Sequence, residues 1–260
     1  MTLRDATSWR RRRLLMPAAL VTVVLLPGLA RPAVASLFGF DDLTIVSKRL
    51  HTGLLAAKYP PETVTTYVTD KTVIVDSPHR RTVVDLEHAT ATLMNKSELT
   101  YSVLPLEELE RKASEADRGN KGDGGARQMV AGQLRTVEIT PTQETVTIAG
   151  HKAKKYVMTR GAATTDLWMS EDFSIPAPLR KWIDLDAVLA PAGAALVAKL
   201  SQLQGLQLKS ESWVLLGEQK QSVVDEVTEV RTAPPPETMT RVPEGFRQVP
   251  WPGLEDTPAP

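Results

Sequence analysis

The chain has 260 residues, of which 42% are hydrophobic, and its 31 basic and 31 acidic residues give a formal net charge of zero. The apolar content excludes a chain disordered throughout. The absence of cysteine excludes disulfides, thiolate metal sites, a cysteine nucleophile and the lipid anchor of a bacterial lipoprotein. Residues 1–35 hold six of the basic residues and one acidic residue, so the remaining chain carries 25 basic and 30 acidic residues. A mildly acidic body argues against general binding to nucleic acid.

Residues 1–35 have the pattern of an export signal. Arg10 to Arg13 form a positive region, an apolar run follows from Leu14 to Leu29, and Ala33-Val34-Ala35 fits signal peptidase, with cleavage before Ser36. The run is shorter than the roughly 20 residues of a spanning helix. We therefore expect a periplasmic or secreted protein with no membrane span after cleavage. An uncleaved anchor is the alternative, and the export route stays open.

The first half of the remaining chain predicts an antiparallel sheet. Val64, Thr66 and Val68 alternate with Thr65 and Tyr67, which is typical of a sheet with one covered face. β-Branched runs between turn residues predict extended segments near 43–50, 63–69, 72–77, 80–86, 89–94 and 98–103.

Helices and a glycine-rich loop follow. Residues 105–117 predict a helix that starts at a proline, carries Glu107 and Glu108 near its positive end and has Leu106 and Leu109 on one apolar stripe. Residues 118–125 contain Gly119, Gly122, Gly124 and Gly125 and predict a flexible loop. Apolar residues at three- and four-residue steps predict a second helical region over 179–203, interrupted at Pro191 and Gly193.

Between these helical regions, Thr142 to Ser170 predicts a hairpin followed by a third extended run. We expect Gly150 at a turn position that needs positive φ, so that Gly150→Val destabilises the turn. Lys152, Lys154 and Lys155 predict a solvated face, with Tyr156 or Val157 turned inward. Near the end of the chain we expect a hairpin over 206–216 and 220–231, a short element over 241–249, and a disordered proline-rich tail over 250–260.

Two parts of the chain resemble a known family. The first part, Ile148 to Tyr156 followed by Asp166 to Ser170, and the second, Val227 to Val230 through Val242 to Phe246, are similar to motifs of uncharacterised exported bacterial domains. That family in turn resembles lipoprotein carriers of the LolA/LolB type. The resemblance implies an α+β fold, a curved antiparallel sheet or half-open β-barrel packed over a few helices, as one domain over residues 36–249. It also implies lipid chains held between barrel and helices, and it contributes no catalytic residues.

Tryptophans and aliphatic residues in the second half are the candidate binding residues. A sheet that curves over helices can leave an apolar cleft, and such clefts are common ligand sites. The alternative for these residues is core packing. The candidates are Trp168, Trp182, Trp213, Leu206, Leu208, Val214 and Leu216.

Catalytic and metal sites lack support in the sequence. His51, His79, His88 and His151 stand at no recognised ligand spacing. The chain has no Gly-x-Ser-x-Gly or Ser-x-x-Lys motif that would make a triad of His79, Asp85 and a serine credible. We therefore expect no catalytic residues, no metal and no cofactor.

These observations favour an exported, non-enzymatic periplasmic or cell-envelope protein that binds a lipid or other hydrophobic ligand in a cleft between sheet and helices. The alternative is an envelope protein–protein interaction module that uses the same sheet as a docking surface. An enzyme is the third possibility.

Overall fold

The structure is a computed structural model, and it describes residues 41–119, 136–173, 175–183, 193–216 and 218–251. These residues belong to one compact unit. The predicted signal segment lies outside the described residues, as do positions 120–125 of the glycine-rich loop and 252–260 of the tail.

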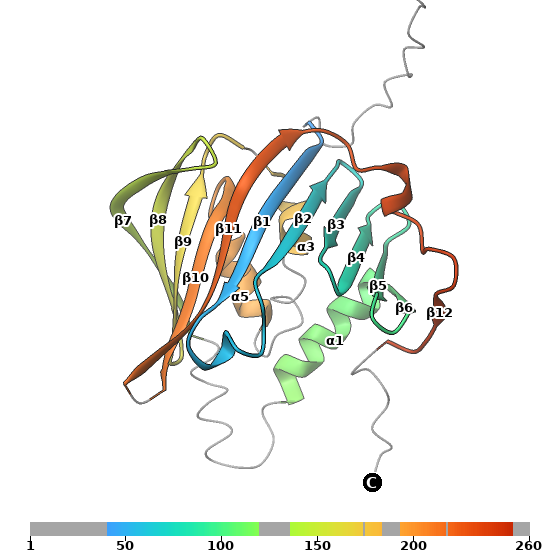
Figure 1. Cartoon of the computed structure of the whole chain (residues 1–260), viewed down its shortest axis with the longest axis horizontal. Helices are drawn as coiled ribbons and strands as arrows, with labels where there is room; N and C mark the ends of the chain where they lie inside the picture. The colour runs from blue at the N-terminus through green and yellow to red at the C-terminus, as the bar shows by residue number, and fades with distance from the viewer. Residues whose placement is uncertain (1–40, 120–135, 174, 184–192, 217, 252–260) are drawn as a thin grey trace, which may run out of the picture. The chain divides into compact units, whose positions relative to one another are not determined.

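A single 12-stranded sheet, curved and not closed into a barrel, dominates the fold (Figure 1). Two meanders, β1 to β6 and β7 to β11, join where β1 pairs with β11, and all pairs are antiparallel except the short parallel pair of β12 with β6. The strands are β1 (Leu43–His51), β2 (Glu62–Val68), β3 (Thr72–Asp76), β4 (Arg80–Asp85), β5 (Thr90–Asn95), β6 (Thr100–Pro105), β7 (Val137–Ile148), β8 (His151–Arg160), β9 (Ala163–Ser170), β10 (Leu206–Leu216), β11 (Gln219–Thr232) and β12 (Arg247–Gln248).

In the part of the chain that the structure describes, three α-helices lie inside the curve of the sheet (Figure 1). They are α1 (Leu106–Gly119), α3 (Ala177–Ile183) and α5 (Gly193–Leu200), and single 3₁₀ turns occur at η1 (Gly53–Leu55) and η2 (Glu237–Met239). Helix α3 contacts β2 and β3, whereas α5 contacts β7 and α1. Buried Leu106 and Leu109 lie one turn apart on α1 and face the core, as the apolar stripe predicted.

The sheet is buried on both faces over part of its width. Adjacent residues of a strand point to opposite faces, yet Val73 and Ile74 of β3 are both fully buried. Val73 belongs to the core under the helices. Ile74 packs on the other face with Tyr67 and with Phe246 of the chain's final segment. The expectation of one covered face is therefore wrong for these strands, because residues 239–246 cover the second face.

The predicted hairpin at Gly150 is confirmed. Ala149 and Gly150, with φ of 50° and 85°, form the two-residue connection between β7 and β8. Positive φ at both positions is the condition for the tight hairpin turn that matches strand twist.

Several predicted boundaries differ. The first helix starts at Leu106, one residue later than predicted, because Pro105 is still paired with Thr90 at the end of β6. The region 179–203 contains two helices, α3 and α5, and the residues between them are not described.

The predicted disordered tail begins too early. Trp251 is buried in the main core. The Ser102 hydroxyl lies 2.9 Å and 3.0 Å from the carbonyl oxygens of Val249 and Pro250, to which it donates. These contacts fix the chain against β6 up to residue 251.

Candidate functional site

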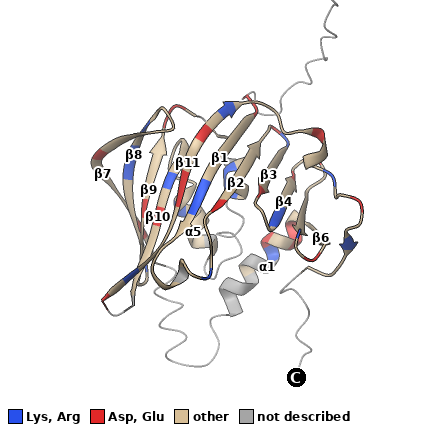
Figure 2. Cartoon of the chain, viewed as in Figure 1, with Lys and Arg blue, Asp and Glu red and all other residues tan. Residues whose placement is uncertain are grey.

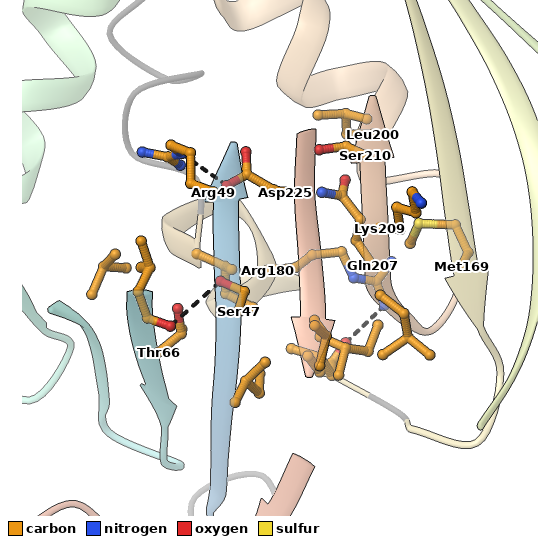
Figure 3. A pocket seen from close by; sticks show the side chains of 18 of the residues that line it. Ser47, Arg49, Thr66, Met169, Arg180, Leu200, Gln207, Lys209, Ser210 and Asp225 are labelled. Carbon is orange, nitrogen blue, oxygen red and sulfur yellow. Dashed lines mark hydrogen bonds and ion pairs between the residues drawn. The ribbon is translucent and has the colours of Figure 1, made fainter. Parts of the chain in front are cut away.

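A cavity of about 250 Å³ lies between the inner face of the sheet and the segment that carries α3 and α5 (Figure 3). Strands β1 to β4 and β9 to β11 contribute to it. Its lining comprises Ile45, Ser47, Arg49, Val64, Thr66, Val75, Ser77, Arg80, Thr82, Met169, Ile175, Arg180, Ile183, Leu200, Leu203, Gly205, Leu206, Gln207, Leu208, Lys209, Ser210, Asp225 and Val227.

The helical side of the cavity is apolar except for Arg180, and the sheet side is mixed. Ile175, Ile183, Leu200 and Leu203 line it from the segment above the sheet. On the sheet, aliphatic residues give way to hydroxyl residues along the same face of β1, β2 and β3, the last at Ser77 just beyond the strand. The switches are Ile45 to Ser47, Val64 to Thr66 and Val75 to Ser77.

Four polar side chains of the lining have no hydrogen-bond partner among the described residues. They are the three hydroxyls of Thr66, Thr82 and Ser210 and the side-chain amide of Gln207. Polar groups inside proteins are nearly always paired. Hydroxyls that line a cavity and remain unpaired can accept or donate to a molecule within it, so the cavity suits a ligand that is only partly apolar.

An ion-pair cluster lies at one part of the lining. The Arg49 Nε is 2.8 Å from Asp225 Oδ1 on β11, and its Nη1 is 3.4 Å from Glu62 Oε1 on β2 (Figure 3). Arg49 stands opposite both residues in the strand register. The side chains are partly exposed, so each pair contributes little stability, but together they bridge three neighbouring strands beside the cavity.

Arg180 of α3 is the most unusual charged group of the lining. Its Nη2 donates to the carbonyl oxygen of Ile175 at 2.8 Å, and its Nη1 donates to the carbonyl oxygens of Ser201 and Leu203. No carboxylate among the described residues pairs with it, its buried Nε has no hydrogen-bond partner, and burial lowers the pKa of the guanidinium from its usual value. The three carbonyl contacts hold the segments on either side of α3 and α5 together above the cavity.

Of the seven predicted binding residues, the structure places Leu206 and Leu208 in the cavity lining. Both are buried on β10. Trp182 of α3 is also buried but packs in the main core outside the lining, with the Lys181 Nζ 4.6 Å from its ring centre. Val214 is half-buried near the end of β10 and does not line the cavity. The side chain of Leu216 lies outside the described part of the structure.

Trp168 and Trp213 lie on the opposite face of the sheet. Trp168 of β9 is paired in register with Lys155 of β8 and with Lys209 of β10. Lys209 is in turn paired with Glu226 of β11, and Glu226 is the neighbour of Asp225, which lines the cavity. Because paired residues share a face and neighbours alternate, Trp168 points to the face opposite Asp225, although Lys209 is also among the lining residues and Trp168 belongs to the same buried cluster as Leu206 and Leu208. Trp213 lies four residues beyond Lys209 on β10 and has the same orientation.

Lysines cover both tryptophans on that face, and the Lys220 Nζ lies 5.1 Å from the Trp213 ring centre. The Nζ atoms of Lys155 and Lys209 lie 5.1 Å and 5.4 Å from the Trp168 ring centre, within cation–π range. The hydrogen bond to Asp166 raises the pKa of Lys155, and Glu144 adds to this effect against partial burial. Basic and acidic residues are interspersed along these strands (Figure 2). We predicted that Lys152, Lys154 and Lys155 share one solvated face. This prediction is wrong for Lys155, because it follows Lys154 directly and adjacent residues of a strand point to opposite faces.

Among the residues that the structure describes, no group of three His, Asp or Glu side chains could hold a metal ion. His88 and His151 each contact one carboxylate, Asp85 at 2.8 Å and Asp172 at 3.0 Å. Within the same described ranges, no helix has the length and apolar character to cross a bilayer.

Comparisons with known proteins give only distant likenesses. No protein-family model and no curated protein matches the sequence. A structure of PNGF-II in space group C2 is 13% identical, with a TM-score of 0.41; the match covers 83% of this chain but only 32% of the PNGF-II chain.

Two further structures match at similar levels. An uncharacterized conserved protein from Thermus thermophilus is 10% identical over 81% of this chain and 91% of its own, with a TM-score of 0.43. MucB is 13% identical over 77% of this chain and 57% of its own, with a TM-score of 0.33. Such scores identify neither a family nor an activity for this chain.

Proposed function

We propose that the protein binds a lipid or another hydrophobic ligand in the cavity between sheet and helices. We further propose that it is an exported, non-enzymatic protein of the periplasm or cell envelope with a LolA-like, half-open barrel. The single observation that carries the binding proposal is the cavity itself, with its aliphatic wall on the helical side and unpaired hydroxyls on the sheet side.

The size of the cavity favours one chain over a whole multi-chain lipid. Its volume of about 250 Å³ lies just below the usual range of roughly 300–1,000 Å³ for small-molecule pockets. Burial of about eight methylene groups, at ~0.8 kcal/mol each, would contribute about 6 kcal/mol. That figure corresponds to a dissociation constant between roughly 1 μM and 1 mM before the cost of association is subtracted.

Two neighbouring threonines of β2 provide a matched test. Thr66 lines the cavity, and Thr65 is equally half-buried but points to the other face. We expect Thr66→Phe to fill the cavity and to weaken the binding of dodecanoate, measured by calorimetry, by about tenfold or more. Thr65→Phe should leave the affinity within about twofold of the wild type.

Both variants would first be checked for an unchanged unfolding midpoint. Equal dodecanoate affinity in Thr66→Phe and the wild type would place any binding outside the cavity. A wild-type protein that binds none of dodecanoate, dodecanol and a phospholipid would overturn the binding proposal.

The export proposal has its own test. Fractionation of the native cell should recover, outside the cytoplasm, a chain that starts at Ser36. Recovery of the full-length chain in the cytoplasm would contradict export.

The protein-interaction alternative has less support. Its two motivating features are the loop at 118–125 and the tail at 250–260, and most of both lies outside the described residues. The described start of the tail is packed against the sheet, with Trp251 buried. Cross-linking in cells that captures one dominant protein, with no lipid in extracts of the purified chain, would favour this alternative.

A further inference from the structure

Exposed large apolar side chains gather at one end of the sheet. Among the described residues, six large hydrophobic side chains are exposed, and four of them belong to β1, the loop after it and the β10–β11 hairpin. These four, here called the apolar tip, are Leu50 (41% exposed), Leu54 (69%), Tyr59 (42%) and Leu215 (61%).

Backbone contacts bring the two parts of the tip together. The Thr52 amide donates to the Ser222 carbonyl at 2.8 Å, and the Leu54 amide donates to the Gln221 side-chain oxygen at 2.6 Å. Gln221 follows Lys220, the partner of Leu215 in the strand register. The loop with η1 and the β10–β11 hairpin therefore lie at the same end of the sheet (Figure 1).

The loop after β1 projects into solvent. All its side chains described between Gly53 and Pro61 are exposed. A protein partner would need a surface of complementary shape, whereas the interface of a bilayer accepts projecting aliphatic and aromatic side chains without one. Tyrosine and lysine are also typical of the lipid headgroup level, and the Lys58 Nζ lies 5.1 Å from the Tyr59 ring centre.

Charge indicates the kind of bilayer. The loop after β1, residues 52–61, contains Lys58 and no acidic residue, although the chain beyond the predicted signal is acidic as a whole. Lys48 and Lys58 are exposed. On the hairpin, Glu218 and Lys220 offset each other. Lys48 stands opposite Glu226 in the strand register, whereas Lys58 is an exposed lysine in a loop that has no acidic residue, and such a lysine favours anionic lipids.

We propose that the apolar tip inserts into the headgroup region of an anionic lipid bilayer. The role of this docking rests on the proposed function, in which the cavity binds a lipid. Arg49 of the cavity lining directly precedes Leu50, so the docked tip would bring the cavity lining close to the bilayer. The docking itself is measured independently of any ligand.

The test uses the chain from Ser36 onward with sedimented vesicles of phosphatidylglycerol and phosphatidylcholine. The variants are Leu54→Glu and Leu215→Glu. Val103→Glu is the control, since Val103 is 41% exposed, like Leu50, but lies on β6 outside the tip. We expect each tip variant to lower vesicle binding by about tenfold or more, and the control to bind like the wild type.

Several results would overturn the proposal. They are a wild-type protein that stays in solution at millimolar lipid, a control variant that loses as much binding as Leu54→Glu, or equal binding to vesicles of phosphatidylcholine alone. Dodecanoate binding separates this proposal from the proposed function. Leu54→Glu should retain it, while Thr66→Phe should lose it and still bind vesicles.

Discussion

Replacement of Gly205 by alanine should destabilise the protein far more than the same replacement at Gly150. Both glycines have φ in the left-handed region, 88° and 85°. A Cβ at Gly150 would meet no atom within 4 Å. A Cβ at Gly205 would lie 2.0 Å from the Ser170 carbonyl oxygen and 2.7 Å from the carbonyl carbon. Those are backbone atoms at the end of β9, so no side-chain rotation relieves the overlap.

The magnitudes follow from these two environments. The left-handed conformation costs an L-residue about 1–2 kcal/mol, which is the whole effect expected for Gly150→Ala. At Gly205 the overlap must also displace the start of β10 from β9, where Leu206 is paired with Ser170. With about two backbone hydrogen bonds weakened at roughly 1 kcal/mol each, the loss for Gly205→Ala should reach about 3–4 kcal/mol.

Urea denaturation, followed by circular dichroism, measures both variants and gives midpoints and slopes. We expect a modest fall of the midpoint for Gly150→Ala, a larger fall for Gly150→Val because branched residues tolerate positive φ poorly, and the largest for Gly205→Ala. Similar midpoints for the two alanine variants would refute the reasoning, because the short contact at Ser170 would then carry no energy. Gly205 also lines the cavity, so Gly205→Ala should weaken dodecanoate binding where the protein still folds.

Two further predictions concern a turn and a carboxyl group. Ala149→Asn should raise the free energy of unfolding by about 0.5–1 kcal/mol, since Ala149 has a φ of 50° and Asn-Gly is the preferred pair for this turn; a lower urea midpoint would contradict it. Asp42→Asn should stabilise the protein at pH 7, because burial, with added repulsion from Asp70 and Asp41, raises the pKa of Asp42 above its usual 3.8. A raised folded-state pKa gives stability that is complete below the unfolded value and is lost as the pH rises through the folded value. The gain from Asp42→Asn should therefore disappear below about pH 3.8, and a gain that persists there would exclude ionisation as its cause.

Local features of the fold were predictable from the sequence. The hairpin at Gly150, the alternation in β2 and the apolar stripe of α1 all depend on residues close in the chain. The pairing of β1 with β11 was not predictable, because neither strand carries a signal that names its partner. The coverage of Ile74 by Phe246 and the burial of Trp251 are long-range contacts of the same kind.

The candidate site was predictable only in part, because side chains along a strand alternate between the two faces of the sheet. Hydrophobicity groups Trp168 and Trp213 with Leu208, but each residue along a strand changes face, and the irregularity between Gln207 and Lys209 changes the alternation within β10. Much of the missed lining comes from β1 to β4 and β11, and the rest from β9, β10 and the segment with α3 and α5. A usable signal was present there, since same-face positions switch from aliphatic to hydroxyl residues within one strand, as at Val64 and Thr66.

The pairing of β1 with β11 also has a consequence for the way the chain reaches its native state. Thr44 donates to the carbonyl of Ala233, which is 189 residues further along the chain. The middle of the sheet therefore closes only after almost all of the domain has been synthesised, whereas its outer hairpins are local. Contacts of such high order slow folding, and until they form, the edges of β1 and β11 resemble unpaired edges prone to aggregation. Assembly should then proceed from two separate meanders, each formed early, whose joining at β1 and β11 is the slow and committing step.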